Sequence, residues 1–159
     1  MDRLNKWLAL AGFIVACLAI GGLGGWATSQ AVIDWYPTLN KPSWNPPSWI
    51  FGPVWTTLYV TMGVAAWLVW MKDIRFSAVR VALILFGIQL ALNCLWSFLF
   101  FKFQNPSWAL VEIVALLIAI ALTTVAFYNQ SKFAGILMVP YLAWVSFATF
   151  LNYNIWQLN

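Results

Sequence analysis

The sequence predicts an all-α protein that crosses a membrane as a bundle of five helices. Hydrophobic residues make up 64% of the chain and charged residues only 8%, whereas a soluble domain carries about 25% charged residues. The mean hydropathy of +0.83 leaves too little polar surface to face water. The apolar runs are too long and continuous for the alternating strands of a membrane barrel. Because lipid offers the backbone no hydrogen-bond partners, these runs must be helices.

Five apolar runs mark the expected spans, which together form one integral membrane domain over residues 1–159. Each run is close to the roughly 20 residues that a bilayer requires. We expect the spans at about residues 7–28, 50–71, 79–101, 107–128 and 133–153. The connections after the second, third and fourth spans are short, so neighbouring helices should run in alternating directions.

Local signals agree with the ends of these spans. Pro53 falls in the first turn of the second span, where a missing N–H costs little. Asn105 followed by Pro106 is typical of an N-cap with proline at the first helical position of the fourth span. Glycines are expected to end the first span, and the four-residue spacing of Gly21 and Gly25 permits close helix approach. That approach serves packing within one bundle or, alternatively, a homodimer.

The one long connection, at about residues 29–49, is stiffened by proline and rich in aromatic rings. We call it the Trp/Pro loop, and it carries Trp35, Trp44 and Trp49. A long loop in a compact bundle is more often functional than accidental. We therefore expect it to cap a pocket for a flat, apolar molecule.

The positive charges predict the orientation of the chain. Five spans place the amino terminus and the 2–3 and 4–5 connections on one side, with six basic residues against two on the other. Cytoplasmic loops carry the excess of Lys and Arg, so we expect the amino terminus inside and the Trp/Pro loop outside an inner membrane. The six residues are Arg3, Lys6, Lys72, Arg75, Arg80 and Lys132; the two are Lys41 and Lys102.

Three further tryptophans lie within the spans rather than at the lipid–water boundary, where tryptophan is common. With alternating span directions, Trp55, Trp96 and Trp144 all fall in the half of the bundle next to the Trp/Pro loop. Large aromatic rings around a cavity offer a stacking surface to a planar ligand. Ordinary aromatic packing is the alternative interpretation.

Polar residues within the spans should face the bundle interior, because lipid makes them costly. For Gln89, hydrogen bonding between helices is the favoured role. Asn93 shares a helix stripe with Trp96, so a ligand contact and a structural hydrogen bond are both open. Glu112 is close to the expected interface, and we expect it to pair with Lys102 or water.

The composition also excludes several functions. The chain has no histidine, which removes the commonest general base and metal ligand. Two cysteines, Cys17 and Cys94, give neither a metal-binding spacing nor a disulfide framework. The net charge of +4 arises from residues scattered at span ends, so it indicates contact with lipid headgroups rather than nucleic acid. We expect no metal site, no required cofactor and no ordinary catalytic group.

A set of tryptophan- and proline-bearing motifs runs through almost the whole chain. They are Trp35-Tyr36, Lys41-Pro42-Ser43-Trp44-Asn45-Pro46-Pro47, Gly52-Pro53-Val54-Trp55, Gln89-Leu90-Ala91-Leu92-Asn93 with Trp96, Trp108-Ala109-Leu110-Val111, and Pro140-Tyr141-Leu142-Ala143-Trp144 with Phe147-Ala148-Thr149 and Leu151-Asn152-Tyr153. Together they resemble the TspO/MBR family, whose members are also called translocator proteins, tryptophan-rich sensory proteins or peripheral-type benzodiazepine receptors.

The resemblance implies a five-helix membrane protein, often a homodimer, that binds porphyrins such as protoporphyrin IX, as well as sterols and benzodiazepine-type ligands. The pocket it implies lies beneath the first loop. The matching residues here are Trp35, Tyr36, Trp55, Asn93, Trp96, Trp144, Ala148 and Leu151. We add Pro47, Tyr59 and Gln89 to these as candidate ligand-binding residues.

We therefore expect a sensor, regulator or transporter of tetrapyrroles rather than an enzyme, with Lys41 near a porphyrin propionate. One alternative is porphyrin degradation that depends on light and oxygen, for which the resemblance implicates Trp55 and Trp144. Another is a scaffold for membrane partners. The family's sterol motif is incomplete here, because Gln157 stands where a basic residue is expected after Tyr153.

Overall fold

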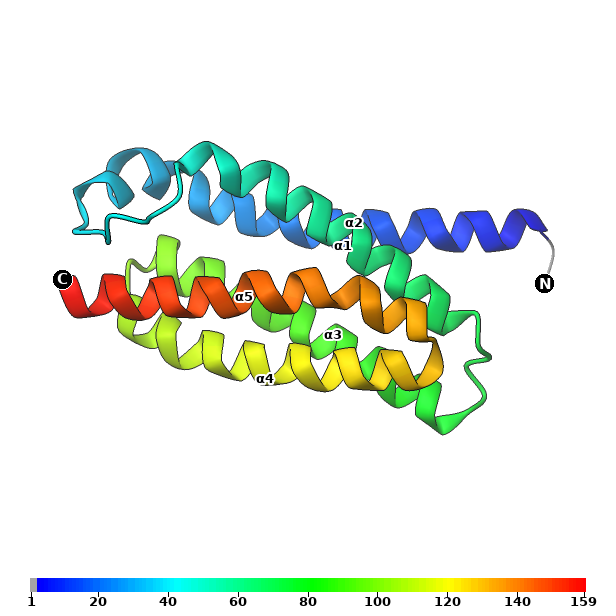
Figure 1. The fold of residues 1–159 in the computed structure, drawn as a ribbon. Helices are drawn as coiled ribbons and strands as arrows, with labels where there is room; N and C mark the ends of the chain where they lie inside the picture. The colour runs from blue at the N-terminus through cyan, green and yellow to red at the C-terminus, as the bar shows by residue number, and fades with distance from the viewer. Residues whose placement is uncertain (1–2) are drawn as a thin grey trace.

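The computed structural model describes residues 3–159, and five long helices dominate them (Figure 1). All five are long and apolar enough to cross a membrane. The predicted all-α five-helix bundle is therefore confirmed. The helices are α1 (Arg3–Asp34), α2 (Phe51–Trp70), α3 (Ser77–Ser97), α4 (Pro106–Gln130) and α5 (Lys132–Leu158).

The five helices lie side by side, and the two ends of the bundle carry different connections. α1 and α2 lie side by side along one edge, α4 and α5 along the other, and α3 passes behind α5 in Figure 1. The α1–α2 loop and the C-terminus share one end, which we call the lid end. The start of α1 and the α2–α3 loop lie at the opposite end.

α1 is longer than the sequence predicts, since it runs for 32 residues through the glycines that were expected to end it. Two of those glycines are sites of close packing. A Cβ on Gly21 would lie 2.4 Å from Cε2 of Tyr59, and one on Gly24 would lie 3.0 Å from Oγ of Ser97. Beyond them, Ala27 and Ala31 are buried. Tertiary contacts therefore keep this segment helical despite the intrinsic cost of glycine.

Local sequence explains where α4 begins and why the α4–α5 turn is so short. The Asn105 side chain accepts a hydrogen bond from the Trp108 N–H at 3.1 Å, with proline at the first helical position, as predicted. A single residue, Ser131, separates α4 from α5. Gly135 makes this tight turn possible, because a Cβ there would lie 2.6 Å from Cα of Tyr128.

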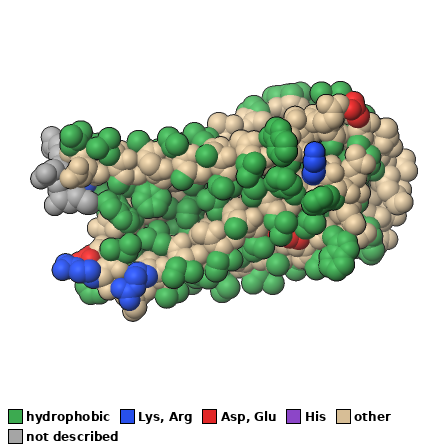
Figure 2. Space-filling model, turned by 180° about the vertical axis from the view of Figure 1, so that it is seen from behind, with side chains coloured by type: hydrophobic (Ala, Val, Ile, Leu, Met, Phe, Trp, Pro, Cys, Tyr) green, Lys and Arg blue, Asp and Glu red, His purple; other side chains and the backbone are tan. Residues whose placement is uncertain are grey.

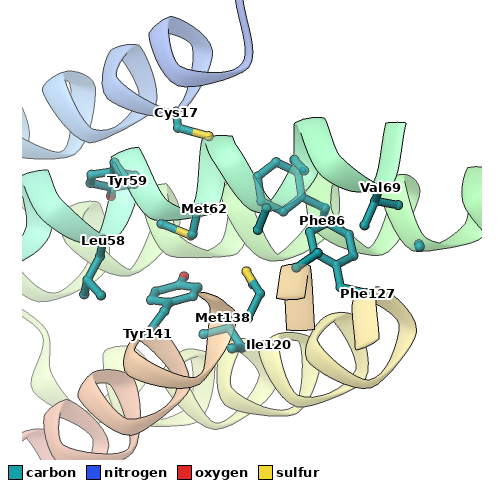
Figure 3. Close-up of a cluster of buried hydrophobic side chains, with 14 of the residues drawn as sticks. Cys17, Leu58, Tyr59, Met62, Val69, Phe86, Ile120, Phe127, Met138 and Tyr141 are labelled. Atoms are coloured by element: carbon teal, nitrogen blue, oxygen red, sulfur yellow. The ribbon is translucent and has the colours of Figure 1, made fainter. Parts of the chain in front are cut away.

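The half of the bundle away from the lid is a close-packed core (Figure 3). Gly63 brings α2 against α1, since a Cβ there would lie 2.8 Å from Cα of Ile14. Phe86 of α3 stacks on Phe127 of α4 with ring centroids 5.6 Å apart. Met62 is fully buried nearby.

Candidate functional site

A cavity of ≈ 430 Å³ lies in the lid-end half, bounded by α1, α2, α3, α5 and the Trp/Pro loop. Small-molecule sites in proteins typically have volumes of about 300–1,000 Å³. The size and position of this cavity therefore make it the candidate ligand site.

Three indole rings from three helices form much of the cavity wall. Trp55 of α2, Trp96 of α3 and Trp144 of α5 all line it. Trp55 packs against Tyr59 at 5.7 Å, Trp96 stacks on Phe100 at 5.2 Å, and Trp144 meets the edge of Phe51 at 6.0 Å. Each ring is thus held in place by another aromatic ring.

Glycine forms the facing wall, on α1. Gly21, Gly22, Gly24 and Gly25 all line the cavity. Leu18, Thr28 and Val32 complete this wall, and the four glycines among them add no side-chain volume to it. The sequence interpretation used these glycines only for helix packing and missed their role at the cavity. Their position opposite three tryptophans across the bundle was the signal that could have revealed it.

A π-helical turn, η3 (Phe98–Lys102), ends α3 and adds two further rings to the cavity. Phe100 and Phe101 of this turn both line the cavity and meet edge-on at 4.8 Å. π-Helical turns are rare and are often found at functional sites. The extra residue in the turn changes which side chains face inward, so the helical periodicity could not predict these two phenylalanines.

A buried network of polar side chains closes the cavity on the side away from the lid, and we call it the floor. The Tyr59 hydroxyl donates to Oδ1 of Asn93, whose Nδ2 donates to the Tyr141 oxygen at 2.9 Å. The Tyr141 hydroxyl in turn donates to Oε1 of Gln89 at 2.9 Å. Figure 3 shows Tyr59 and Tyr141 facing one another across the bundle. The floor therefore ties α2, α3 and α5 together.

Asn152 makes a second polar link beside the cavity. Its Oδ1 accepts from Nε1 of Trp96 at 3.1 Å, and its Nδ2 donates to the Pro106 carbonyl at 2.9 Å. The same residue lines the cavity. This link orients the Trp96 ring and joins α3 to α5 and the start of α4.

The Trp/Pro loop forms a lid over the cavity. Because α1 continues to Asp34 and α2 begins at Phe51, we use the name lid for residues 35–50, which include the short turns η1 (Tyr36–Thr38) and η2 (Ser48–Ile50). The Tyr36 hydroxyl donates to Oδ1 of Asn45 at 2.8 Å. Burial raises the pKa of the Tyr36 phenol, and the hydrogen bond to Asn45 partly opposes that shift. The phenol therefore stays protonated at neutral pH and keeps its role as a donor.

Lys41 holds the lid in shape rather than facing the cavity. Its Nζ donates to the carbonyls of Tyr36 at 2.7 Å and Leu39 at 2.8 Å, and lies 5.0 Å from the centre of the Tyr36 ring. A lysine ammonium has three donors, and these contacts occupy most of them. The structure therefore does not place Lys41 where a ligand carboxylate in the cavity would meet it.

The lid is fastened to the end of α5. The backbone N–H of Asn40 donates to Oδ1 of Asn159 at 2.9 Å, and Nδ2 of Asn159 donates to the Asn40 carbonyl at 2.9 Å. Trp44 stacks on Phe150 with centroids 5.3 Å apart and planes 10° from parallel. The lid is therefore closed over the cavity in this structure.

Eight of the eleven predicted site residues line the cavity. They are Tyr36, Trp55, Tyr59, Asn93, Trp96, Trp144, Ala148 and Leu151.

The other three predicted residues are not among those that line the cavity. Trp35 packs edge-on against Phe100 at 5.7 Å, and Pro47 precedes η2 in the lid. Gln89 is fully buried in the floor. Its hydrogen bonding between helices agrees with the favoured interpretation of the sequence. Asn93 belongs to the floor and also lines the cavity, so its contact with a ligand stays a prediction.

Glu112 corrects a prediction. Both of its carboxyl oxygens are buried without a hydrogen-bond partner, and Lys102 instead lies 5.2 Å from the centre of the Trp26 ring. The structure does not pair Glu112 with Lys102, so that part of the expectation was wrong. Glu112 is buried, as its polar character within a span predicts, but its partner depends on how α4 and its neighbours pack.

The cavity offers stacking surface and hydrogen bonds rather than charge. Among the described residues, those that line it include no Lys, Arg, Asp or Glu. Within residues 3–159, no group of three or more His, Cys, Asp or Glu side chains could hold a metal ion. The arrangement is suited to enclosing a largely apolar, flat molecule.

Comparison with known proteins agrees with this geometry. Residues 13–157 match the TspO/MBR family. The chain is 50% identical to the tryptophan-rich protein TspO of Chlorobaculum tepidum, over 98% of this chain and 99% of that protein. It is 43% identical to the translocator protein of Homo sapiens, over 96% and 91% of the two chains. It is also 37% identical to the tryptophan-rich sensory protein of Cereibacter sphaeroides, over 96% and 92%.

Proposed function

The chain belongs to the TspO/MBR family, and from that premise we propose that it binds porphyrins of the protoporphyrin IX type, and related flat apolar ligands, in the cavity beneath its lid. Relatives carry the names translocator protein and tryptophan-rich sensory protein. Through this binding the protein acts as a sensor or a transporter of tetrapyrroles in the membrane.

The observation that carries the proposal is the set of indole rings around one cavity. Trp55, Trp96 and Trp144 reach it from three different helices. Flat aromatic ligands stack on such rings, and each aromatic contact contributes about 0.5–1.5 kcal/mol beyond simple burial. The uncharged lining favours the macrocycle itself and offers no cation to the propionates of a bound porphyrin.

Titration of the purified protein with protoporphyrin IX, followed by quenching of tryptophan fluorescence, tests the proposal. The double substitution Trp55→Ala, Trp144→Ala should weaken binding by at least about tenfold. The matched control is Trp49→Ala, Trp108→Ala, which removes two exposed indoles that do not line the cavity. Equal affinity in the two double variants would reject the cavity as the binding site.

The uncharged lining leads to a second measurement. The dimethyl ester of protoporphyrin IX should bind within about threefold of the free acid, because no charged side chain meets the propionates inside the cavity. Complete loss of binding on esterification would show that a cationic side chain recognises the ligand.

A second function is favoured by the position of Trp55 and Trp144, which line the same cavity and so present two oxidisable rings to one ligand. We propose that they support porphyrin breakdown driven by light and oxygen. Loss of the porphyrin absorption bands under illumination in air should disappear in the Trp55→Ala, Trp144→Ala variant. Breakdown at the same rate in darkness without oxygen would contradict this function.

The orientation of the protein follows from its charge. On the face shown in Figure 2, most Lys and Arg side chains lie at the end of the bundle away from the lid, where the α2–α3 loop is. By the positive-inside rule, we place that end in the cytoplasm and the lid outside. A cysteine introduced at the exposed Ser43 of the lid should then react in intact cells with a maleimide that cannot cross the membrane.

A further inference from the structure

α1 and α2 touch closely along the part of their shared seam that runs from below the cavity up to its floor. A Cβ on Gly63 of α2 would lie 2.8 Å from Cα of Ile14 on α1. One turn closer to the lid, a Cβ on Gly21 would lie 2.4 Å from the Tyr59 ring. At these points no side chain and no ligand could pass between the two helices.

The same seam is open alongside the cavity. Gly22 and Gly25 of α1 and Gly52 of α2 all line the cavity, and all three are exposed at the protein surface. A Cβ built on any of them would meet no heavy atom within 4 Å. A residue that borders a cavity and is also exposed marks its mouth. The mouth therefore lies between α1 and α2, on the side of the bundle.

This mouth faces lipid. Gly22 and Gly25 lie within the candidate span Leu4–Asp34, and Gly52 lies within Ser48–Trp70. Side chains around the opening are apolar or small: Leu18, Ser48 and Thr56 also line the cavity and are exposed. An apolar ligand dissolved among acyl chains would meet no charged side chain on this path.

The alternative path, past the lid, is obstructed. The Asn40–Asn159 hydrogen bonds and the Trp44–Phe150 stack fasten the lid to α5. Below it, Tyr36 packs against Phe101 of η3 at 5.8 Å. A ligand arriving from water through the lid would have to break these contacts, whereas the side opening requires none of them to break.

We propose that ligands enter and leave the cavity sideways from the bilayer, through a portal between α1 and α2 that Gly22, Gly25 and Gly52 keep open. The proposal rests on the cavity being the ligand site, as proposed above. It assigns the glycines of α1 a second role, in which the missing side chains set the rate of exchange with lipid.

The test is to narrow the portal and measure exchange kinetics. Gly25→Leu adds a side chain at the mouth, in open space. In lipid vesicles, rapid mixing with protoporphyrin IX should show association and dissociation rates that both fall by about tenfold. The dissociation constant should stay within about twofold of the wild type, because a narrower passage slows both directions equally.

The matched control is Gly12→Leu, which lies on the same helix, is exposed, has nothing within 4 Å of its Cβ position and does not line the cavity. Its rates should equal those of the wild type. Unchanged rates in Gly25→Leu would reject the portal. A lower association rate with an unchanged or higher dissociation rate would also reject it, since Gly25 would then shape the site and not the passage.

A second arm tests the lid. Asn40→Ala, Asn159→Ala removes the side-chain hydrogen bonds that fasten it. Side entry predicts unchanged rates in this variant, and an increase in both rates would show that ligands pass the lid.

The whole comparison is repeated with pyrene, an uncharged flat hydrocarbon that dissolves in lipid and accepts energy from excited tryptophan. If protoporphyrin IX does not quench the wild type but pyrene binds and shows the Gly25→Leu effect, the porphyrin proposal fails and the portal stands. If pyrene binds with rates unaffected by Gly25→Leu, the portal fails. If neither molecule binds, both proposals fail together with the cavity site.

Discussion

In the half of the bundle away from the lid, small and large side chains fill a solid core, whereas in the lid-end half large aromatic rings border an open cavity. Ala65 and Ala66 of α2, Ala82 of α3 and Ala134 of α5 are all fully buried in the first half. In the second half, the corresponding inward positions carry tryptophan, and α1 opposes them with glycine. The same helices therefore give a solid core at one end and a cavity at the other.

The difference teaches that the cavity arises from mismatched sizes and not from missing structure. Interiors normally fill to the density of organic crystals, which requires that large residues face small ones of matching depth. Here each indole is braced by another ring, as Trp96 is by Phe100. The rings cannot collapse onto the glycine wall, so the space remains. The floor between the halves keeps this space separate from the core.

The largest effect on stability should come from removing a large ring from the half of the bundle away from the lid, if that half is close-packed. Phe127→Ala deletes a fully buried ring that stacks on Phe86, and should cost about 3–5 kcal/mol of unfolding free energy. Thermal unfolding in detergent micelles measures the loss. A cost below about 1 kcal/mol would mean that this half also has free space.

A larger side chain should destabilise the close-packed half of the bundle but not the half that contains the cavity. Ala66→Leu overpacks the core and should cost about 1–3 kcal/mol, whereas Ala148→Leu points into the cavity and should leave stability unchanged. Ala148→Leu should instead abolish binding of protoporphyrin IX, because it occupies ligand space. Equal destabilisation by the two substitutions, compared by thermal unfolding, would contradict the contrast.

The floor should contribute less than the core. Tyr141→Phe removes a hydroxyl that accepts from Asn93 and donates to Gln89. Hydrogen bonds between membrane helices average about 0.6 kcal/mol each, with a maximum near 1.7, so the expected loss is about 1 kcal/mol. The same unfolding measurement detects it, and Tyr128→Phe, on an exposed ring, is the control.

The smallest effect on stability should come from the α2–α3 loop, which lies outside the spans at the end of the bundle away from the lid. The Arg75 guanidinium donates to the Asp73 carboxylate and lowers its pKa from 3.8 to about 2. Because the pKa of Asp73 is lower in the folded chain, its charged form stabilises the fold at pH values above 3.8. This stabilisation is lost as the pH falls from about 4 through about 2, where the carboxylate takes up a proton. Asp73→Asn should therefore reduce the melting temperature slightly at pH 7, and the difference from the wild type should vanish near pH 2.

Asn suits this test because Asp73 has a φ of 82°, a left-handed conformation that asparagine tolerates. The substitution thus removes the charge without straining the loop. Arg75 is exposed and Asp73 partly exposed, so an effect larger than that of Tyr141→Phe would show that the α2–α3 loop contributes more to stability than its solvent exposure implies.

The candidate site shows where sequence reasoning succeeds and where it stops. Trp55, Trp96 and Trp144 could be assigned to one half of the bundle because alternating span directions fix the depth of each position. The floor was only partly foreseen, since the polar character of Gln89 and Asn93 predicts an inward side chain but names no partner. That Tyr141 joins them depends on how α5 is rotated.

The sequence by itself determined the membrane setting, the five helices and the depth of the aromatic rings, because lipid imposes strict rules on length, polarity and backbone hydrogen bonding. Tertiary structure alone decided how the helices pack in detail, and with it the separation of Glu112 from Lys102, the engagement of Lys41 by the lid and the opening beside Gly25. This packing depends on how distant side chains fit together. No single segment carries that information.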